Sequence, residues 1–306
     1  MTGKVVIAGG SGFLGSALAR SLATAGADIV ILSRQPASPS GRIRTVVWDG
    51  RTVGLWAAEL EGAAAVVNLA GRSVACRFTA ENRRLILASR LDSVRAIAAA
   101  TAGCRLPPAV LVQASAVGIY GDSGDRICTE ASAPSGTDFI AGVAKAWEEA
   151  FFAAEAAGGP RRVALRIGFV LGRTGGALAP LAKLARFFLG GSAGNGKQYL
   201  SWIHVDDVCA IVRWVIERPG ASGVYHATGP APVTQAEFMR ALRRALGRPW
   251  SPPAPAWAVR LGARFFLRVD PDLALTGQRC PPRRLLDEGF RFQWPVLPAA
   301  LADLLP

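Results

Sequence analysis

Cysteine and histidine are scarce in this chain of 306 residues, which contains five cysteines and two histidines. The cysteines are scattered, odd in number and nowhere spaced as Cys-x-x-Cys, so neither a disulfide framework nor a zinc site is expected. Their pattern predicts free thiols in a reducing compartment. We therefore expect no bound metal.

Long hydrophobic runs are also missing. No stretch approaches the uninterrupted apolar length that spans a bilayer, and no secretory signal precedes the first expected strand, which begins near Lys4. These absences predict a cytoplasmic protein with no membrane partner. Hydrophobic residues make up 51% of the chain, which predicts one large globular domain or a domain with a smaller lobe.

Acidic residues are outnumbered by basic ones, and the net charge is +13. The arginines are spread along the chain and do not alternate with aromatic residues in a short tract, so we expect no nucleic-acid partner. The positive charge instead suits a phosphorylated cofactor. We expect a small-molecule substrate. The sequence leaves open whether the chain forms a homodimer.

Glycines are concentrated directly after the first apolar run. Residues 5–8 are typical of a buried strand, and residues 13–19 are typical of a helix. Between them, Gly10-x-Gly12-x-x-Gly15 fits the dinucleotide fingerprint, which needs glycine for a tight turn and for close approach of the backbone to a pyrophosphate. The helix start adds N–H groups that bind phosphate. The residues predicted to bind the cofactor here are Gly9, Gly12, Phe13, Leu14 and Gly15.

The second expected strand, residues 28–34, ends in Ser33-Arg34. An NAD-binding fold usually has an acidic residue at this point, which binds the ribose hydroxyls. A hydroxyl and a guanidinium instead suit a 2′-phosphate, so we predict NADP (NADPH) as the cofactor, with Ser33 and Arg34 in contact with it. An ordinary surface arginine is the alternative.

Further apolar runs at 42–48, 63–71, 109–114 and 163–167 are typical of strands, and 79–102 and 137–157 are typical of helices. This alternation predicts an α/β fold with a Rossmann-type doubly wound parallel sheet.

Glycine and proline become frequent after Gly168, which predicts a smaller C-terminal substrate lobe. We expect a cofactor domain over 1–168, and a lobe over 169–306 that is interleaved with the last sheet strands. In that part we expect strands at 198–204 and 223–227, helices at 205–217 and 234–246, and short helices broken by proline from Arg248 onward.

The chain resembles the extended short-chain dehydrogenases/reductases, and more narrowly their atypical "epimerase family protein" subgroup of NADP-dependent oxidoreductases. The most specific stretch is 190–207, Gly-Gly-Ser-Ala-Gly-Asn-Gly-Lys-Gln-Tyr-Leu-Ser-Trp-Ile-His-Val-Asp-Asp. Other marks are the glycine turn (residues 9–15), Asn68-Leu69-Ala70-Gly71, Ser89-Arg90-Leu91-Asp92, residues 115–121, Trp147-Glu148 and residues 285–292. The resemblance implies further cofactor contacts by Leu69, Ala70, Gly71, Arg90, and the segment from Gly168 to Val170.

Working enzymes of this clan use a Tyr-x-x-x-Lys pair and a Ser or Thr hydroxyl, and this chain breaks that pattern. Aligned by the resemblance, Ala141 takes the tyrosine position, Lys145 the lysine position and Ala116 the hydroxyl position. Lys145 is then expected to hold a ribose or a phosphate, with a surface lysine as the alternative.

Ser115 and Tyr120 follow a strand end where ligands bind in parallel sheets, so either could donate a proton to a substrate carbonyl. Packing in the turn is the alternative for Tyr120.

Two other features, His204 and the loop 190–196, are each open to two interpretations. His204 could carry a proton, but a structural role before a helix that Asp206 could start is favoured. The loop 190–196 is either a lid over the substrate or a surface loop. The other histidine, His226, lies among apolar residues and is expected to be structural.

The sequence thus predicts an NADP(H)-dependent oxidoreductase for a small carbonyl or sugar-like compound, with Ser115, Tyr120 and Lys145 as candidate catalytic residues. The alternative is an NADP(H)-binding sensor or regulatory protein without turnover.

Overall fold

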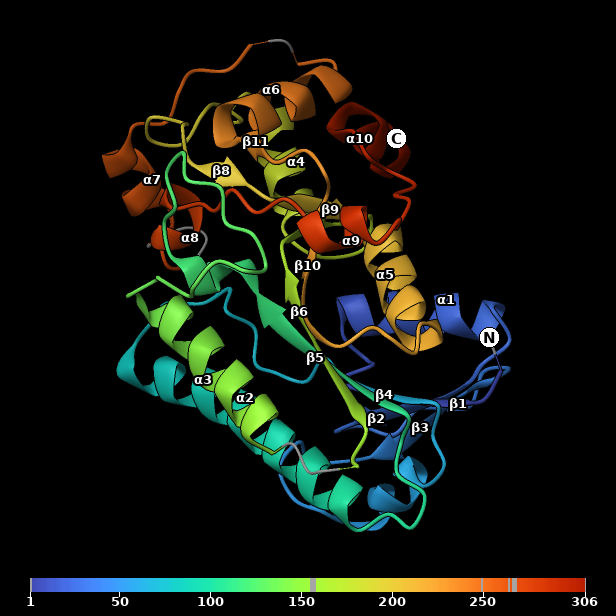
Figure 1. Ribbon diagram of the computed structural model, residues 1–306. Coiled ribbons are helices and arrows are strands. Elements are labelled where there is room, and N and C mark those ends of the chain that lie inside the picture. Colours follow the sequence, from blue (N-terminus) through green and yellow to red (C-terminus); the bar gives the residue numbers. More distant parts are fainter. Residues whose placement is uncertain (1, 155–157, 249, 264, 266–268, 306) are drawn as a thin grey trace.

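A seven-stranded parallel sheet runs through the computed structural model, which describes residues 2–154, 158–248, 250–263, 265 and 269–305 (Figure 1). The strand order is β10-β6-β5-β4-β1-β2-β3. This confirms the predicted Rossmann-type sheet, whose order reverses between β1 and β4. The strands are β1 Lys4–Ala8, β2 Asp28–Ser33, β3 Ile43–Val47, β4 Ala65–Asn68, β5 Val110–Ala116, β6 Arg161–Ile167 and β10 Gly223–Ala227.

Helices cover both faces of the sheet. On one face α1 (Phe13–Thr24) and α5 (Val205–Glu217) pack on Val5 and Ile7 of β1. On the other face α2 (Ala80–Ala102), α3 (Phe139–Ala153) and the 3₁₀ helix η1 (Leu55–Leu60) cover Val6 and Ala8. Because successive side chains of a strand point to opposite faces, a sheet covered on both sides needs continuous apolar runs, as β1 has.

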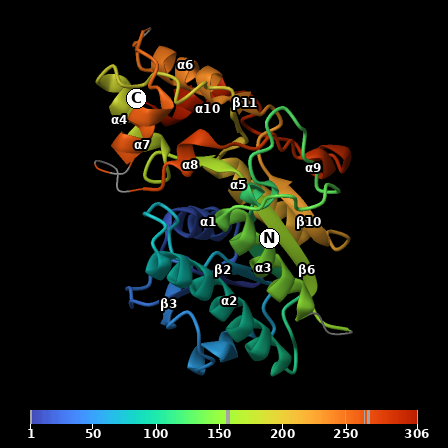
Figure 2. The ribbon, with the colours of Figure 1, turned by 90° about the vertical axis from the view of Figure 1, so that its left-hand side faces the viewer.

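The smaller lobe is built around a separate apolar core that includes Trp202, Phe238 and Leu301. Figures 1 and 2 show this lobe beyond one end of the sheet. Its elements are β7 Phe169–Leu171, α4 Leu178–Arg186, β8 Tyr199–Leu200, β9 Trp202–His204, β11 Val233–Thr234, α6 Gln235–Ala245, α7 Ala256–Gly262, α8 Asp272–Leu275, α9 Arg283–Asp287 and α10 Leu297–Leu304.

The strand expected at 198–204 is two strands with different partners. β8 pairs with β11, whereas β9 pairs with β7. Ser201 lies between them, with its carbonyl bonded to the Phe169 N–H of β7 and its hydroxyl donating to the Gln278 carbonyl. The prediction of one continuous strand is therefore wrong.

α5 has the predicted bounds, but Asp206 does not start it. His204 is the N-cap, and its Nδ1 accepts from the Asp206 N–H at 3.1 Å. Asp206 instead lies in the first turn, where a negative charge favours the helix dipole.

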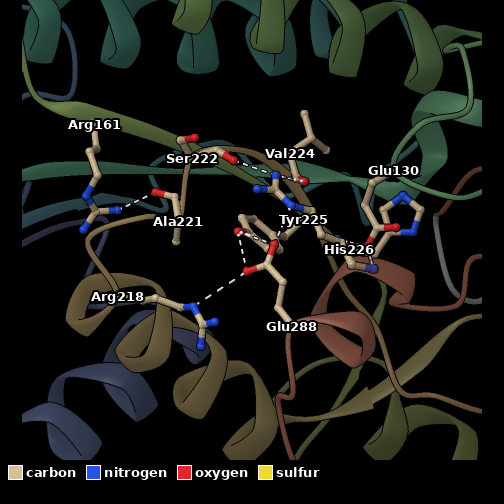
Figure 3. A network of polar contacts seen from close by, with 10 residues as sticks. Glu130, Arg161, Arg218, Ala221, Ser222, Val224, Tyr225, His226 and Glu288 are labelled. Atoms are coloured by element: carbon tan, nitrogen blue, oxygen red, sulfur yellow. Dashed lines mark hydrogen bonds and ion pairs between the residues drawn. The ribbon is translucent and has the colours of Figure 1, made fainter.

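The C-terminal segment returns to the edge of the sheet at β10. Arg284 donates to the carbonyls of Ser222 and Val224, and a carboxylate oxygen of Glu130 accepts from the His226 N–H. Figure 3 shows Tyr225 of β10 pointing at Glu288, whose two carboxylate oxygens each lie 3.1 Å from the Tyr225 hydroxyl. Side chains thus satisfy polar groups of the edge strand, which would otherwise invite pairing with another chain.

Across the described ranges, no helix combines the length and the apolar character that a membrane crossing requires.

Candidate functional site

The glycine turn between β1 and α1 leaves no room for side chains. Gly9 has φ +76°, and a Cβ there would lie 2.9 Å from the backbone of Ala70. A Cβ on Gly15 would lie 2.6 Å from both the Gly10 Cα and the Gly9 carbonyl oxygen. The turn therefore holds β1, α1 and the loop after β4 at backbone contact, as a dinucleotide cradle requires.

The start of α1 is open to an anion. Its N-cap, Gly12, offers no side-chain cap, and the first turn contains no acidic residue. The Gly12 carbonyl accepts from the Ser16 N–H at 2.8 Å, so the helical bonding begins there and the preceding N–H groups point out of the helix end. These groups and the positive end of the helix dipole fit a pyrophosphate.

A second glycine-rich loop, residues 172–176, covers the first turn of α1. Cβ atoms on Gly172 and Gly175 would each lie 2.5 Å from the Phe13 ring. Phe13 therefore packs directly against this loop, which follows β7. The contact brings the predicted segment from Gly168 to Val170 to the same edge of the sheet as the glycine turn.

A cavity of about 810 Å³ lies beside this turn, at the carboxyl ends of β2 and β3. Its wall combines apolar side chains that suit a planar base with four arginines that suit phosphate. The lining residues are Leu32, Arg34, Val47, Trp48, Asp49, Gly50, Arg51, Ala70, Gly71, Arg72, Ser73, Arg84, Leu85, Ala88, Ser89 and Asp92.

Of the four arginines, Arg34 is the one whose side chain has no partner among the described residues. Arg84 is engaged by Glu81, Arg72 by Asn82, and Arg51 lies 3.5 Å from Asp49. Within the ranges that the structure describes, no hydrogen bond or ion pair engages the exposed Arg34 side chain. Its neighbour Ser33 donates to the Ser11 hydroxyl at 3.2 Å, which joins the end of β2 to the glycine turn.

Buried polar groups shape the turn after β4. The Asn68 side chain accepts from the Ala70 N–H at 3.1 Å and donates to Gln113 at 2.9 Å, which fixes Leu69, Ala70 and Gly71 beside the glycine turn. This orienting role of Asn68 was not predicted, since Gln113 lies 45 residues away in the sequence.

Arg90 lies against the turn after β4. Its guanidinium donates to the carbonyls of Arg72 and Ile86, each at 3.0 Å, and lies over the Trp147 ring. Burial lowers the pKa of Arg90 to about 10. None of the ion pairs found among the described residues involves Arg90, so its charge is left for an anionic ligand.

At Ala141, which the resemblance aligns with the clan's tyrosine, the structure leaves no room for a large side chain. Ala141 is fully buried, and a Cβ on Gly136 would overlap that of Ala141. The loop before α3 thus fills the space over residue 141. Lys145, one turn further along α3, donates to the Gly136 carbonyl at 2.7 Å and is partly exposed.

The two candidate proton donors, Ser115 and Tyr120, join one buried network. Ser115 donates to Glu148 at 2.5 Å, and Glu148 forms a bidentate ion pair with Arg166 at 2.7 and 2.9 Å. Arg166 also donates to the Tyr120 hydroxyl at 2.5 Å, and the Nε2 atom of His226 lies 2.8 Å from that hydroxyl.

Tyr120 is only 1% exposed, and burial raises its pKa above the usual range. Its hydroxyl is surrounded by Arg166, His226 and the carbonyl of Thr129. This placement argues against proton donation to a substrate and for packing in the turn. Burial also lowers the pKa of His226 to about 4. The network could not be foreseen, since Tyr120 and His226 are 106 residues apart.

The remaining candidates lie in structural contacts. His204 caps α5 and has its Nε2 atom 3.3 Å from Asp303. In the loop 190–196, a Cβ on Gly191 would overlap the Pro252 carbonyl, and Ala193 is bridged to Ala254. In the described part of the chain, no group of three or more His, Cys, Asp and Glu residues could hold a metal ion.

Comparison with known proteins gives consistent matches. A model of the "NAD dependent epimerase/dehydratase family" matches residues 5–227, and a domain of unknown function (DUF1731) matches 254–304. The chain is 35% identical over 304 residues to the epimerase family protein YfhF of Bacillus subtilis, covering 99% of this chain and 98% of that protein. It is 33% identical over 305 residues to the human epimerase family protein SDR39U1, covering 99% of each.

Similarity to solved structures extends over the same length. The crystal structure of human SDR39U1 (isoform 2) with NADPH superposes with a TM-score of 0.87 at 32% identity, covering 98% of each chain. A nucleoside-diphosphate sugar epimerase from Corynebacterium glutamicum has a TM-score of 0.79 at 32% identity, covering all of this chain and 58% of that one.

Proposed function

This chain belongs to the NAD dependent epimerase/dehydratase family, and we propose that it is an NADP(H)-dependent oxidoreductase that acts on a small carbonyl or sugar-like compound. The observation that carries the proposal is the pairing of an uncapped helix start with an exposed, unengaged Arg34 at the rim of the adjoining cavity. A dinucleotide with a third phosphate is suited by both features, because the N–H groups bind the pyrophosphate and the guanidinium binds the additional phosphate. NADPH in the crystal structure of human SDR39U1 supports the same cofactor.

The residues present fit this cofactor. We assign the pyrophosphate to the N–H groups of Phe13, Leu14 and Gly15, next to Gly9 and Gly12, and the 2′-phosphate to Ser33 and Arg34. Leu69, Ala70 and Gly71 would line its middle. Arg90 would add positive charge there, and Gly168 and Val170 would flank the nicotinamide end.

When bound, the cofactor supplies hydride transfer. In this chain Lys145 is the candidate ribose anchor, because one donor of its ammonium reaches Gly136 and an ammonium has three. Ser115 would act by orienting Glu148 and Arg166 at the end of β5, since its hydroxyl proton points to Glu148. We propose no chemical role for Tyr120.

A cofactor sensor without turnover is the second candidate function. It is favoured by the filled space over Ala141 and by the inward-facing hydroxyls of Ser115 and Tyr120. Both candidates require the same NADP(H) site, so they differ only in whether a substrate reacts.

Mixing the protein with NADPH and a broad panel of carbonyl compounds separates the two functions. The oxidoreductase predicts loss of reduced-nicotinamide absorbance with at least one compound, and a lower rate in Lys145→Ala. Lys183→Ala on α4 is the matched control, since Lys183 is exposed in the smaller lobe. NADPH binding with no substrate-dependent loss across the panel would favour the sensor, whereas no NADPH binding would exclude both functions.

A further inference from the structure

The exposed aromatic side chains of this protein are gathered in one part of the smaller lobe. Among the described residues, every strongly exposed aromatic side chain lies within 187–189 or 250–265. The outer patch, as we name it, consists of Phe187, Phe188, Leu189, Trp250, Trp257 and Leu261, which are 48–70% exposed. A soluble chain seldom leaves such large apolar side chains in water without an interaction that uses them.

The two segments of the outer patch run beside each other. Ser251 donates to the Phe188 carbonyl at 2.6 Å, and Ala193 is bridged to Ala254, which precedes α7. Trp257 and Leu261 then follow on α7, four residues apart and so on one side of the helix. Figures 1 and 2 show α7 at the outside of the smaller lobe, away from the central sheet.

Phe188 has a backbone conformation that phenylalanine rarely adopts. Its φ is +60°, and it is the one described residue other than glycine with a positive φ. It stands where α4 ends, with the Leu189 N–H donating to the Leu184 carbonyl, a position that glycine usually occupies. A large aromatic residue is thus kept exposed at a strained position, and strained residues cluster at functional sites.

The chain segments that carry the outer patch have charges of one sign. Residues 178–198 and 238–263 contain three and five basic residues, respectively, and no acidic residue. Lys183, Arg186 and Arg260 are exposed, and the Arg248 guanidinium lies 5.3 Å from the centre of the Phe188 ring. Two copies of the chain that met through this surface would oppose these cations, which disfavours a symmetric dimer here.

We propose that the outer patch docks the protein onto an anionic lipid bilayer. Projecting Trp, Phe and Leu side chains suit the boundary between headgroups and acyl chains, and flanking Lys and Arg suit anionic headgroups. An acidic protein would need a pocket for each of these projecting side chains, whereas a bilayer accepts them without one. The proposal departs from the sequence-based expectation of no membrane partner. That expectation rested on the lack of a long apolar run, and peripheral docking needs no spanning segment.

Sedimentation with vesicles tests the proposal. We expect the full-length protein to sediment with vesicles of phosphatidylcholine and phosphatidylglycerol, and far less with phosphatidylcholine alone. The double variant Trp250→Ser/Trp257→Ser keeps the net charge and should lower the partition coefficient at least about tenfold. Leu55→Ser is the matched control, because Leu55 is 98% exposed and lies in η1 on the other lobe.

Three results would overturn the proposal. Absence of sedimentation with the anionic vesicles is the first. Equal sedimentation of the double variant and the native protein is the second, since it would mean adsorption through the net positive charge alone. The third is a native dimer in solution that the double variant loses, which would identify a second copy as the occupant. Circular dichroism and thermal unfolding of the double variant, unchanged from the native protein, establish that a loss of binding is not a loss of fold.

Discussion

At the scale of single residues, the site separates into side chains that face a ligand and side chains that face one another. Arg34 and Arg90 have no anionic partner among the described residues. Ser115, Tyr120 and Lys145 all have partners within the protein. The guanidinium groups of Arg34 and Arg90 are therefore left for a ligand, whereas the hydroxyls of Ser115 and Tyr120 bond within the protein.

Replacing Tyr120 by Phe should destabilise the protein without changing cofactor affinity. The hydroxyl accepts from Arg166 and lies 2.8 Å from His226, so its loss leaves both buried groups short of a partner. We expect the free energy of unfolding in urea to fall by about 1–3 kcal/mol. Tyr199→Phe is the control, since the described residues offer its hydroxyl no partner. Full stability together with a lost reaction would restore Tyr120 as the proton donor.

His226 should make stability depend on pH. Its Nδ1 donates to the Pro281 carbonyl, so Nε2 faces Tyr120 as an acceptor and the ring is neutral. Burial lowers its pKa to about 4, whereas the unfolded chain takes up the proton near pH 6.5. Stability is therefore complete above pH 6.5 and falls as the pH drops toward 4.

Between pH 7 and 5 we expect a loss of about 2 kcal/mol, measured by urea unfolding at each pH. His226→Asn should be less stable at pH 7 but flatter with pH. The chain contains only one other histidine, so His204→Asn is the control for the loss of an imidazole elsewhere in the protein. An equal slope in native protein and His226→Asn would assign the pH dependence to other groups.

The structure of the glycine turn was predictable because everything it requires is local in the sequence: a tight turn, a strand before it and a helix after it. The position of Arg34 directly after β2, at the cavity, was predictable from the apolar run that precedes it, whereas its contact with a phosphate stays a prediction. The inward orientation of Ser115 and Tyr120 was not, since their partners Glu148, Arg166 and His226 are 33, 46 and 106 residues away. Chain-distant partners leave no pattern in a single sequence.

At the scale of elements, strands buried on both faces were found because they are continuous apolar runs, and α5 and β10 have the predicted bounds. The elements that were missed are short or lie among glycines, as η1, β7 and α4 do. At the start of α6, Thr234 and Glu237 form a capping box with both of its hydrogen bonds present, and this residue pair at this spacing is a sequence signature of a helix start. The start of a helix can thus be predicted from neighbouring residues in the sequence. The pairing of a two-residue strand cannot, because it depends on the fold around that strand.

The contact between α9 and β10 should stabilise the whole sheet edge. Arg284 donates to the Ser222 carbonyl at 2.6 Å and to Glu288 at 2.8 Å, and its guanidinium lies 3.9 Å from the centre of the Tyr225 ring. Arg284→Met removes these bonds and exposes the carbonyls of an edge strand. We expect the free energy of unfolding to fall by about 1–3 kcal/mol and aggregation to increase on warming.

Light scattering during a thermal ramp measures that aggregation. Arg283→Met is the matched control, since the neighbouring Arg283 is exposed and lies 3.8 Å from the exposed Asp287. Equal scattering from the two variants would contradict the protective role of Arg284.

At the scale of the whole molecule, two lobes meet over the start of α1. Phe13 of the sheet domain packs on the loop 172–176, and the C-terminal segment returns to β10. Residues 223–227 of β10 complete the sheet although they follow the first elements of the smaller lobe. A ligand at the start of α1 would touch both lobes, so its binding should stabilise the molecule as a unit.

We propose that Ser33 and Arg34, at the end of β2, select the nicotinamide cofactor by its 2′-phosphate. Isothermal titration of NADPH and NADH into the native protein and into Arg34→Ala tests it most directly. Arg42→Ala is the matched control, because Arg42 pairs with Asp28 at 2.8 Å, at the opposite end of β2.

We expect the native protein and Arg42→Ala to bind NADPH more tightly than NADH. Arg34→Ala should lose about 10- to 100-fold in affinity for NADPH and less than about threefold for NADH, since a charge-assisted bond to the phosphate contributes about 1.5–3 kcal/mol. Equal weakening of both cofactors, or native protein that binds them equally, would contradict the account.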